Sequence, residues 1–174
     1  MSFTHLHLAS GYSFKYGTTL PDQLVEHAAK LEMDSIALTD RDTLAGAIRF
    51  AKSCQLNSIA PIIGIDIECE NKSRVTLLAT PGNWSSLVRL VTEIKKSDTP
   101  ITLEFFEKHS SHATKLLALY GPSSNISKAL FHKRNNEALL LFNRTKDIFK
   151  NQAIECVSHL TKSGRKSTSH AAKM

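Results

Sequence analysis

The amino-acid sequence predicts an α/β fold with mostly parallel strands, arranged as a barrel or as a doubly wound sheet. Strand-like and helix-like segments alternate through the first 95 residues, which is the pattern of parallel βα units. The chain has 174 residues, of which 41% are hydrophobic, so a single domain can bury a real core. Charged residues make up 22% and aromatic residues 7%, and this composition excludes a disordered chain.

The first half of the chain is predicted to contain four parallel strands with helices between them. The first helix begins near Pro21, because proline suits the first turn and Asp22 favours the positive end of a helix. Asp42 and Thr43 are expected to cap the second helix. The strands are expected at residues 3–8, 35–39, 59–67 and 75–79, and the helices at 20–31, 44–54 and 84–94.

The second half of the chain is less regular and shows no internal repeat. A turn with a helix cap is expected at residues 121–125, where glycine, proline and serine follow one another. Residues 163–169 are predicted to form a polar loop, and residues 170–174 the start of a helix. The remaining elements are expected as helices at 103–109 and 136–147 and as strands at 115–120 and 153–159.

The formal net charge of +6 is unevenly distributed along the chain. Residues 1–70 hold 5 basic and 9 acidic side chains, whereas residues 108–174 hold 12 basic and 3 acidic ones. A basic C-terminal third can form a nucleic-acid surface, or it can be the solvated face of amphipathic helices. Solvated helix faces are the commoner explanation, so charge alone does not assign a function.

The sequence favours a cytoplasmic protein without a membrane partner. The longest apolar runs, such as residues 59–67, are much shorter than the roughly 20 residues of a membrane helix. The N-terminus lacks the basic start and apolar stretch of a signal peptide. The three cysteines are far apart and form no CxxC motif, so we expect reduced thiols rather than disulfides or a zinc site.

Candidate site residues lie where predicted strands end, which is where barrels and doubly wound sheets place their chemistry. His5 and His7 would share one face of the first strand, Asp40 follows the second strand, and Asp66 follows a glycine in the third. Imidazoles and carboxylates that converge on one barrel mouth can form a hydrolytic metal site. A His-x-His pair alone is a weak signal, because one histidine is more often buried and the other an ordinary strand residue.

Four stretches of the sequence together resemble one known family. They are HLHLASGYS at residues 5–13, PDQLVEHA at 21–28, IALTDRD at 36–42 and PIIG at 61–64. These stretches resemble the PHP (polymerase and histidinol phosphatase) domain, in particular the PHP domain at the N-terminus of bacterial DNA polymerase III alpha subunits of the error-prone type. The resemblance extends over essentially the whole chain and is most specific in residues 1–95.

The resemblance implies an incomplete form of the distorted β/α barrel of this family, which is similar to a TIM barrel. Residues 1–174 would form a single PHP domain, truncated before the last barrel strands. Intact members hold up to three metal ions, often zinc or manganese. Their metal sites support phosphoesterase or 3′–5′ exonuclease chemistry, in which the metals activate water and neutralise phosphate.

Two residues of this chain match the metal ligands of the family. His7 matches the second histidine of the His-x-His-x-His motif, and Asp66 matches the carboxylate of the Gly-x-Glu motif. Intact members use about nine ligands, and two cannot hold a metal cluster in competition with water. We therefore expect a vestigial metal site at His7 and Asp66, with no catalytic residue and no bound cofactor.

Four other positions depart from the ligand pattern of the family. Ala9 stands at the third histidine, and Tyr16 replaces the aspartate that precedes a glycine. Arg41 replaces the histidine of the Thr-Asp-His motif, and Arg74 appears to replace the histidine on the following strand. Alanine and tyrosine remove ligands, while the two arginines place permanent cations where divalent metals would lie.

The remaining residues of the barrel mouth then have structural roles. Asp40 is expected to accept backbone amides at the strand–helix turn, and His5 to pack against the barrel rim. Asp40 and Asp42 flank Arg41, and Asp66 points into the same mouth by strand alternation. We expect Arg41 to replace the metal as the counter-charge of these carboxylates, through a hydrogen bond to Asp66 or to another carboxylate.

Three functions are compatible with the sequence. The first is a non-catalytic structural module of a polymerase in DNA replication, translesion synthesis or repair, whose partners would be the rest of the alpha subunit or replisome proteins. The second is a metal-dependent phosphoesterase or exonuclease with a reduced site, in which His159 or His170 joins His7 and Asp66. The third is a module that binds DNA weakly through the basic C-terminal third.

Overall fold

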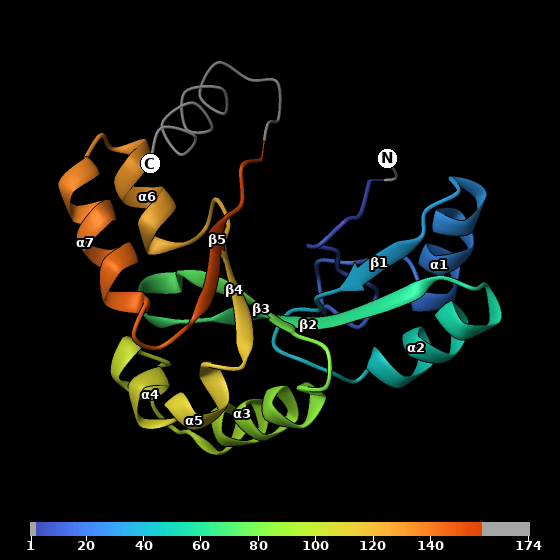
Figure 1. The fold of residues 1–174 in the computed structure, drawn as a ribbon, viewed down its shortest axis with the longest axis horizontal. Helices are drawn as coiled ribbons and strands as arrows, with labels where there is room; N and C mark the ends of the chain where they lie inside the picture. Colours follow the sequence, from blue (N-terminus) through green and yellow to red (C-terminus); the bar gives the residue numbers. More distant parts are fainter. Residues whose placement is uncertain (1–2, 158–174) are drawn as a thin grey trace.

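Five strands form one open sheet in the computed structural model of the protein, which describes residues 3–157 (Figure 1). The strands follow one another across the sheet in chain order. They are β1 (Ser35–Leu38), β2 (Ala60–Glu68), β3 (Arg74–Ala79), β4 (Leu116–Tyr120) and β5 (Asn151–Ile154). The pairs β1–β2 and β4–β5 are parallel, whereas β2–β3 and β3–β4 are antiparallel. The predicted α/β class with an unclosed sheet is therefore confirmed.

The direction of β3 contradicts the prediction that the first four strands are all parallel. Only residues 69–73 connect β2 to β3, and they contain the short 3-10 helix η1 (Glu70–Lys72). A parallel pair needs a crossover of roughly a dozen residues or more, so this connection is too short for one. Asn71 and Lys72 have φ values of 55° and 52°, left-handed conformations that allow the chain to reverse here.

The segment predicted as the first strand, residues 3–8, forms no strand and bends at Leu6 and His7. It lies beside β1, where the amide of Ala37 donates to the carbonyl of His5 at 2.9 Å and the amide of Thr39 donates to that of Leu8 at 2.8 Å. These hydrogen bonds cover the outer edge of β1. They also hold the backbone on both sides of His7, which lies at the edge of the site.

Seven α-helices surround the sheet within the described residues (Figure 1). The second helix begins at residue 47 rather than 44, because Asp42 has a φ of 54° and the chain first turns there. The cap predicted near residue 124 is confirmed, since the Ser124 side chain accepts from the amide of Ser127 at 3.1 Å. The helices are α1 (Pro21–Lys30), α2 (Ala47–Leu56), α3 (Trp84–Lys96), α4 (Leu103–Lys108), α5 (Ser110–Ala113), α6 (Asn125–Phe131) and α7 (Asn135–Thr145).

Sequence patterns placed the last elements less accurately. The strand predicted at residues 153–159 is β5, which begins two residues earlier and ends at Ile154. The loop predicted at residues 163–169 and the helix predicted at 170–174 lie outside the described residues. None of the helices that the structure describes is long and apolar enough to cross a membrane.

Two groups of buried apolar side chains hold the fold together. The smaller group joins α1 and α2 to β1 through Val25, Ile36 and Phe50. The larger group joins β2, β3 and β4 to the helices α3 to α7, with fully buried side chains such as Leu77 and Leu87. Truncation of such a side chain to alanine typically costs about 2–5 kcal/mol of stability, so these groups fix the sheet on which the site is built.

Alternation along β2 and β3 places polar residues on the face opposite the larger core. Ile65 and Ile67 of β2 are buried in that core, so Asp66 between them points to the other face. Asp66 pairs in register with Thr76 of β3, and Glu68 pairs with Arg74. The sheet therefore brings the carboxylate of β2 and the guanidinium of β3 together on one face.

Candidate functional site

The candidate site is a cavity of about 280 Å³ at one edge of the sheet. This edge receives the C-terminal ends of β2, β4 and β5 and the N-terminal end of β3, because β3 is antiparallel to its neighbours. Of the residues predicted to cluster there, His7, Arg41 and Asp66 line the cavity and Asp40 does not. The lining residues are His7, Ala9, Tyr16, Arg41, Asp66, Arg74, Thr76, Gly121, Pro122, Ser123, Glu155 and Val157.

Arg74 forms the dominant ion pair of this site with Asp66. Its Nε donates to Asp66 Oδ2 at 2.7 Å, and its Nη2 donates to the Asp66 carbonyl oxygen at 2.7 Å. The same guanidinium reaches Asp42 Oδ2 at 2.9 Å and Glu68 Oε2 at 3.1 Å. Only 11% of the Arg74 side chain and 3% of the Asp66 side chain are exposed, so solvent screens this pair weakly.

The charge on Asp66 is maintained by its neighbours. Burial opposes ionisation of this carboxyl, but His7 and Arg74 outweigh burial and hold its pKa below the ordinary value. One oxygen of the carboxylate, Oδ1, is buried and has no hydrogen-bond partner among residues 3–157. Asp66 is therefore an ionised side chain whose contacts come mainly through Oδ2 and the backbone.

His7 lies between two carboxylates. Its Nδ1 is 2.9 Å from Glu155 Oε2, and its Nε2 is 3.8 Å from Asp66 Oδ2. The nearby carboxylates of Asp66 and Glu155 outweigh burial and raise the pKa of His7 from 6.5 to about 9. The two carboxylates therefore favour the charged form of the imidazole.

Glu155 is the site residue that the sequence patterns missed. It follows β5 directly, so it occupies the same strand-end position as the residues that were identified. Gly121, directly after β4, makes room for it, because a Cβ at position 121 would lie 2.6 Å from Glu155 Oε2. Strand-end position was the signal for Glu155, but the predicted strand at 153–159 placed this residue inside the strand.

Arg41 does not make the expected hydrogen bond. Its Nε is 3.5 Å from Asp66 Oδ2 and has no hydrogen-bond partner within the described part of the chain, although the two groups form an ion pair. Its guanidinium carbon instead lies 3.3 Å from the centre of the Tyr16 ring. Arg74 is the nearer counter-charge, because β3 is paired with β2 and brings its guanidinium directly to Asp66. Arg41 thus forms the predicted ion pair with Asp66 but not the hydrogen bond, and the main counter-charge is Arg74.

Asp40 has a different partner from the one expected. Its buried carboxylate accepts the amide of Ser10 at 2.6 Å and the hydroxyls of Ser10 and Ser13, the latter at 2.7 Å. It therefore accepts one backbone amide, but it fixes the segment after residue 9 rather than its own strand–helix turn. His5 is exposed, packs edge-on against the ring of Phe3 at 4.8 Å and does not line the cavity.

The residues of this cavity do not fit a metal cluster. Across residues 3–157, no group of three or more His, Cys, Asp or Glu side chains has the arrangement of a metal site. Asp66 Oδ2, the oxygen nearer to His7, already accepts a hydrogen bond from Arg74 Nε. His7 Nδ1 is hydrogen-bonded to Glu155 Oε2. The chemistry of this donor set is that of an ion-pair network that joins β2, β3, residues 3–8 and the end of β5.

Comparison with known proteins identifies similar sequences and folds. A family model described as PHP domain matches residues 5–159. An error-prone DNA polymerase of Symbiobacterium thermophilum is 40% identical over 101 residues, which are 58% of this chain and 9% of that protein. A DNA polymerase III subunit alpha of Buchnera aphidicola is 32% identical over 147 residues, which are 77% of this chain and 12% of that protein. The chain thus spans about a tenth of the length of these curated relatives.

A solved structure shares the fold at much lower sequence identity. An amidohydrolase from Chromobacterium violaceum aligns with a TM-score of 0.59 and 15% identity, over 98% of this chain and 82% of that one. At this identity the likeness concerns the fold alone.

Proposed function

This chain belongs to the PHP domain family, and we propose that it is a non-catalytic PHP module that supports a DNA polymerase alpha subunit. The observation that carries the proposal is the ion pair between Arg74 and Asp66. In this pair the guanidinium binds the carboxylate oxygen of β2 that would otherwise be a candidate metal ligand. The similar proteins are DNA polymerases many times longer than this chain, so its partners would be the rest of an alpha subunit or other replisome proteins.

Electrostatics supports the loss of the metal. Two unit charges about 4 Å apart interact by roughly 4 kcal/mol at an effective dielectric constant of about 20. A divalent ion at Asp66 would lie close to the Arg74 guanidinium and would be opposed by roughly twice that energy. Arg74 cannot lose its proton at physiological pH, so the repulsion is permanent.

The same contacts support a structural role for the site. Arg74 holds Asp66 of β2 and also Asp42, which precedes α2. His7 and Glu155, 148 residues apart in the chain, join the first described segment to the end of β5. The ion pairs thus connect segments from both ends of the described chain.

Metal titration tests the proposal. Calorimetry with Zn²⁺ and with Mn²⁺ should show well under one equivalent bound per chain, with the same result by elemental analysis after purification without chelator. The matched positive control restores the ligands of the family through Ala9→His, Tyr16→Asp, Arg41→His and Arg74→His together. Stoichiometric metal in the unmodified chain, lost on His7→Ala, would disprove the proposal.

A second candidate function is a reduced metal-dependent phosphoesterase, and the position of Glu155 favours it. Glu155, His7 and Asp66 give three ligand-type side chains on one cavity. The other ligands considered from sequence, His159 and His170, lie outside the described residues. Metal-dependent hydrolysis of p-nitrophenyl phosphate that disappears in Glu155→Gln would select this function over the structural one.

Weak DNA contact through the basic C-terminal third is a further part of the proposal. In the described part of this third, Arg134 pairs with Glu137 and Arg144 pairs with Glu104, which reduces the charge available to phosphate. Filter binding to single-stranded and duplex DNA over a salt series measures the contact directly. A binding constant for DNA that does not change with salt concentration would contradict DNA as a partner.

A further inference from the structure

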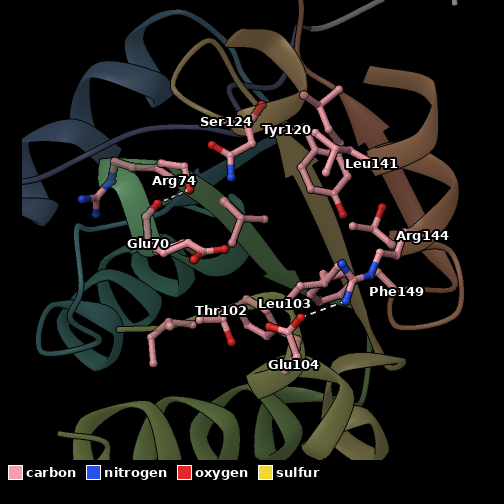
Figure 2. Close-up of a pocket in the computed structure, with 18 residues that line it drawn as sticks. Glu70, Arg74, Thr102, Leu103, Glu104, Tyr120, Ser124, Leu141, Arg144 and Phe149 are labelled. Carbon is pink, nitrogen blue, oxygen red and sulfur yellow. Dashed lines mark hydrogen bonds and ion pairs between the residues drawn. The ribbon is translucent and has the colours of Figure 1, made fainter. Parts of the chain in front are cut away.

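A second cavity lies outside the candidate site, between the sheet and the helices α4, α6 and α7 (Figure 2). Its volume is about 150 Å³. Buried apolar side chains line it from four elements: Val75 of β3, Phe106 of α4, Ile126 of α6 and, after α7, Phe149. None of these side chains takes part in the ion-pair network described above, so the cavity needs a separate explanation.

The size and lining of this cavity suit one small apolar group. An apolar cavity of about 150 Å³ is large enough to bind benzene. The buried Tyr120 also lines the cavity, and its hydroxyl is satisfied by Gln152 Oε1 at 3.3 Å. The interior therefore offers apolar contact to a ring or a branched chain and leaves no need for a strongly polar group there.

The cavity is lined by two carboxylates, those of Glu70 and Glu104, and by two guanidinium groups, those of Arg74 and Arg144. Arg144 is paired with Glu104 at 2.9 Å, and Arg74 directs its guanidinium to Asp66, Asp42 and Glu68. Glu70 takes part in none of these ion pairs, and within residues 3–157 its carboxylate has no ion-pair partner. Glu70 is exposed, and Figure 2 shows its side chain directed toward the other residues that line the cavity.

We propose that this cavity binds a small organic cation that has an apolar ring or branched chain and one ammonium group. The apolar part would lie among Val75, Phe106 and Ile126, and the ammonium group would meet Glu70 at the mouth. The Glu104–Arg144 pair is close to neutral as a unit, so Glu70 decides the sign of the preferred ligand. An anion of the same size would be repelled by Glu70, and a neutral analogue would lose the ion pair.

Three probes of similar size separate these contributions: 2-phenylethylamine, the neutral 2-phenylethanol and the anionic 3-phenylpropanoate. Binding is measured from the ¹³C methyl resonances of Val75 and Ile126, with ligand up to about 10 mM to cover weak affinities. We expect saturable shifts for the amine, about tenfold weaker binding for the alcohol and none for the carboxylate. No saturable shift with the amine, or equal affinity for all three probes, would overturn the proposal.

Two variants test the assignment of residues. Glu70→Gln should weaken binding of 2-phenylethylamine about tenfold and leave that of 2-phenylethanol unchanged. Its matched control is Glu93→Gln on α3, which removes an exposed carboxylate that does not line this cavity. Leu103→Trp, which fills the cavity from α4, should abolish binding of both probes while the melting temperature shows that the chain remains folded. An unchanged affinity for the amine in Glu70→Gln would contradict the role of this carboxylate.

Discussion

Arg74 Nε and Asp66 Oδ2 lie 2.7 Å apart on neighbouring antiparallel strands, and both side chains are largely buried. Solvent screens the attraction between two such buried charges only weakly. Each charge needs the other, because a buried charge without a partner is costly. The PHP family resemblance assigns a metal-binding histidine to the position of Arg74. An arginine there supplies the positive charge that the buried Asp66 carboxylate requires.

Arg74→Ala should destabilise the protein by about 3–5 kcal/mol, because it leaves Asp66 buried without its main partner. Urea unfolding followed by circular dichroism measures the change. The matched control is Arg49→Ala, which breaks an exposed ion pair with Asp22 and should change the stability little. If the two variants had equal midpoints, the buried pair would not be a principal stabilising contact.

Arg41→Ala should cost less than Arg74→Ala, roughly 1 kcal/mol. The Arg41 side chain is 34% exposed, makes no hydrogen bond to Asp66 and contributes mainly by stacking on Tyr16. Tyr16→Leu removes the same stacking and should give a similar loss, and the double variant should lose little more than either single one. A loss in Arg41→Ala as large as in Arg74→Ala would return the role of main counter-charge to Arg41.

The stability of the protein should fall as the pH rises from 6 to 8.5. The pKa of His7 is about 9 in the folded state and 6.5 as a free side chain, so the charged form stabilises the fold fully below pH 6.5. That contribution is lost as the pH rises toward 9, and we expect a loss of roughly 1–2 kcal/mol over this range. Urea unfolding at both pH values measures the loss, and His7→Gln should largely remove the pH dependence. Stability that rises over this range would contradict a charged His7.

Local sequence patterns predict some residues of the site but not the direction of every strand. Strand ends and alternation placed His7 and Asp66 at one mouth, since these follow from local periodicity. The direction of β3 is not contained in its apolar pattern, and only the length of the connection at residues 69–73 reveals it. That direction places Arg74 at the same edge as Asp66, where its guanidinium lies nearer to the carboxylate than that of Arg41.

Glu155 shows a different limit of sequence reasoning. Its role depends on the boundary of β5 and on a contact with His7 across 148 residues, and neither is encoded in a local pattern. Gly121 gave a further indirect signal, because a residue without a side chain directly after a strand allows another group to approach closely. Only the assembled sheet shows that the approaching group is a carboxylate.

Gly121→Ala should separate Glu155 from His7 without touching either residue. The new Cβ would lie 2.6 Å from Glu155 Oε2 and 3.9 Å from His7 Nδ1, so the carboxylate must move away. His7 would keep Asp66 as its remaining carboxylate neighbour, and its pKa should fall below about 9 while staying above 6.5. Titration of the His7 ring protons by NMR measures this shift, and unfolding in urea should show a loss of about 1 kcal/mol for the hydrogen bond.

Gly82→Ala is the matched control, because Gly82 has a φ of 77° with nothing within 4 Å, so the substitution strains the backbone far from the site. Gly82→Ala should lower the stability and leave the pKa of His7 unchanged, whereas an unchanged His7 pKa in Gly121→Ala would show that Glu155 does not hold the imidazole in its charged form.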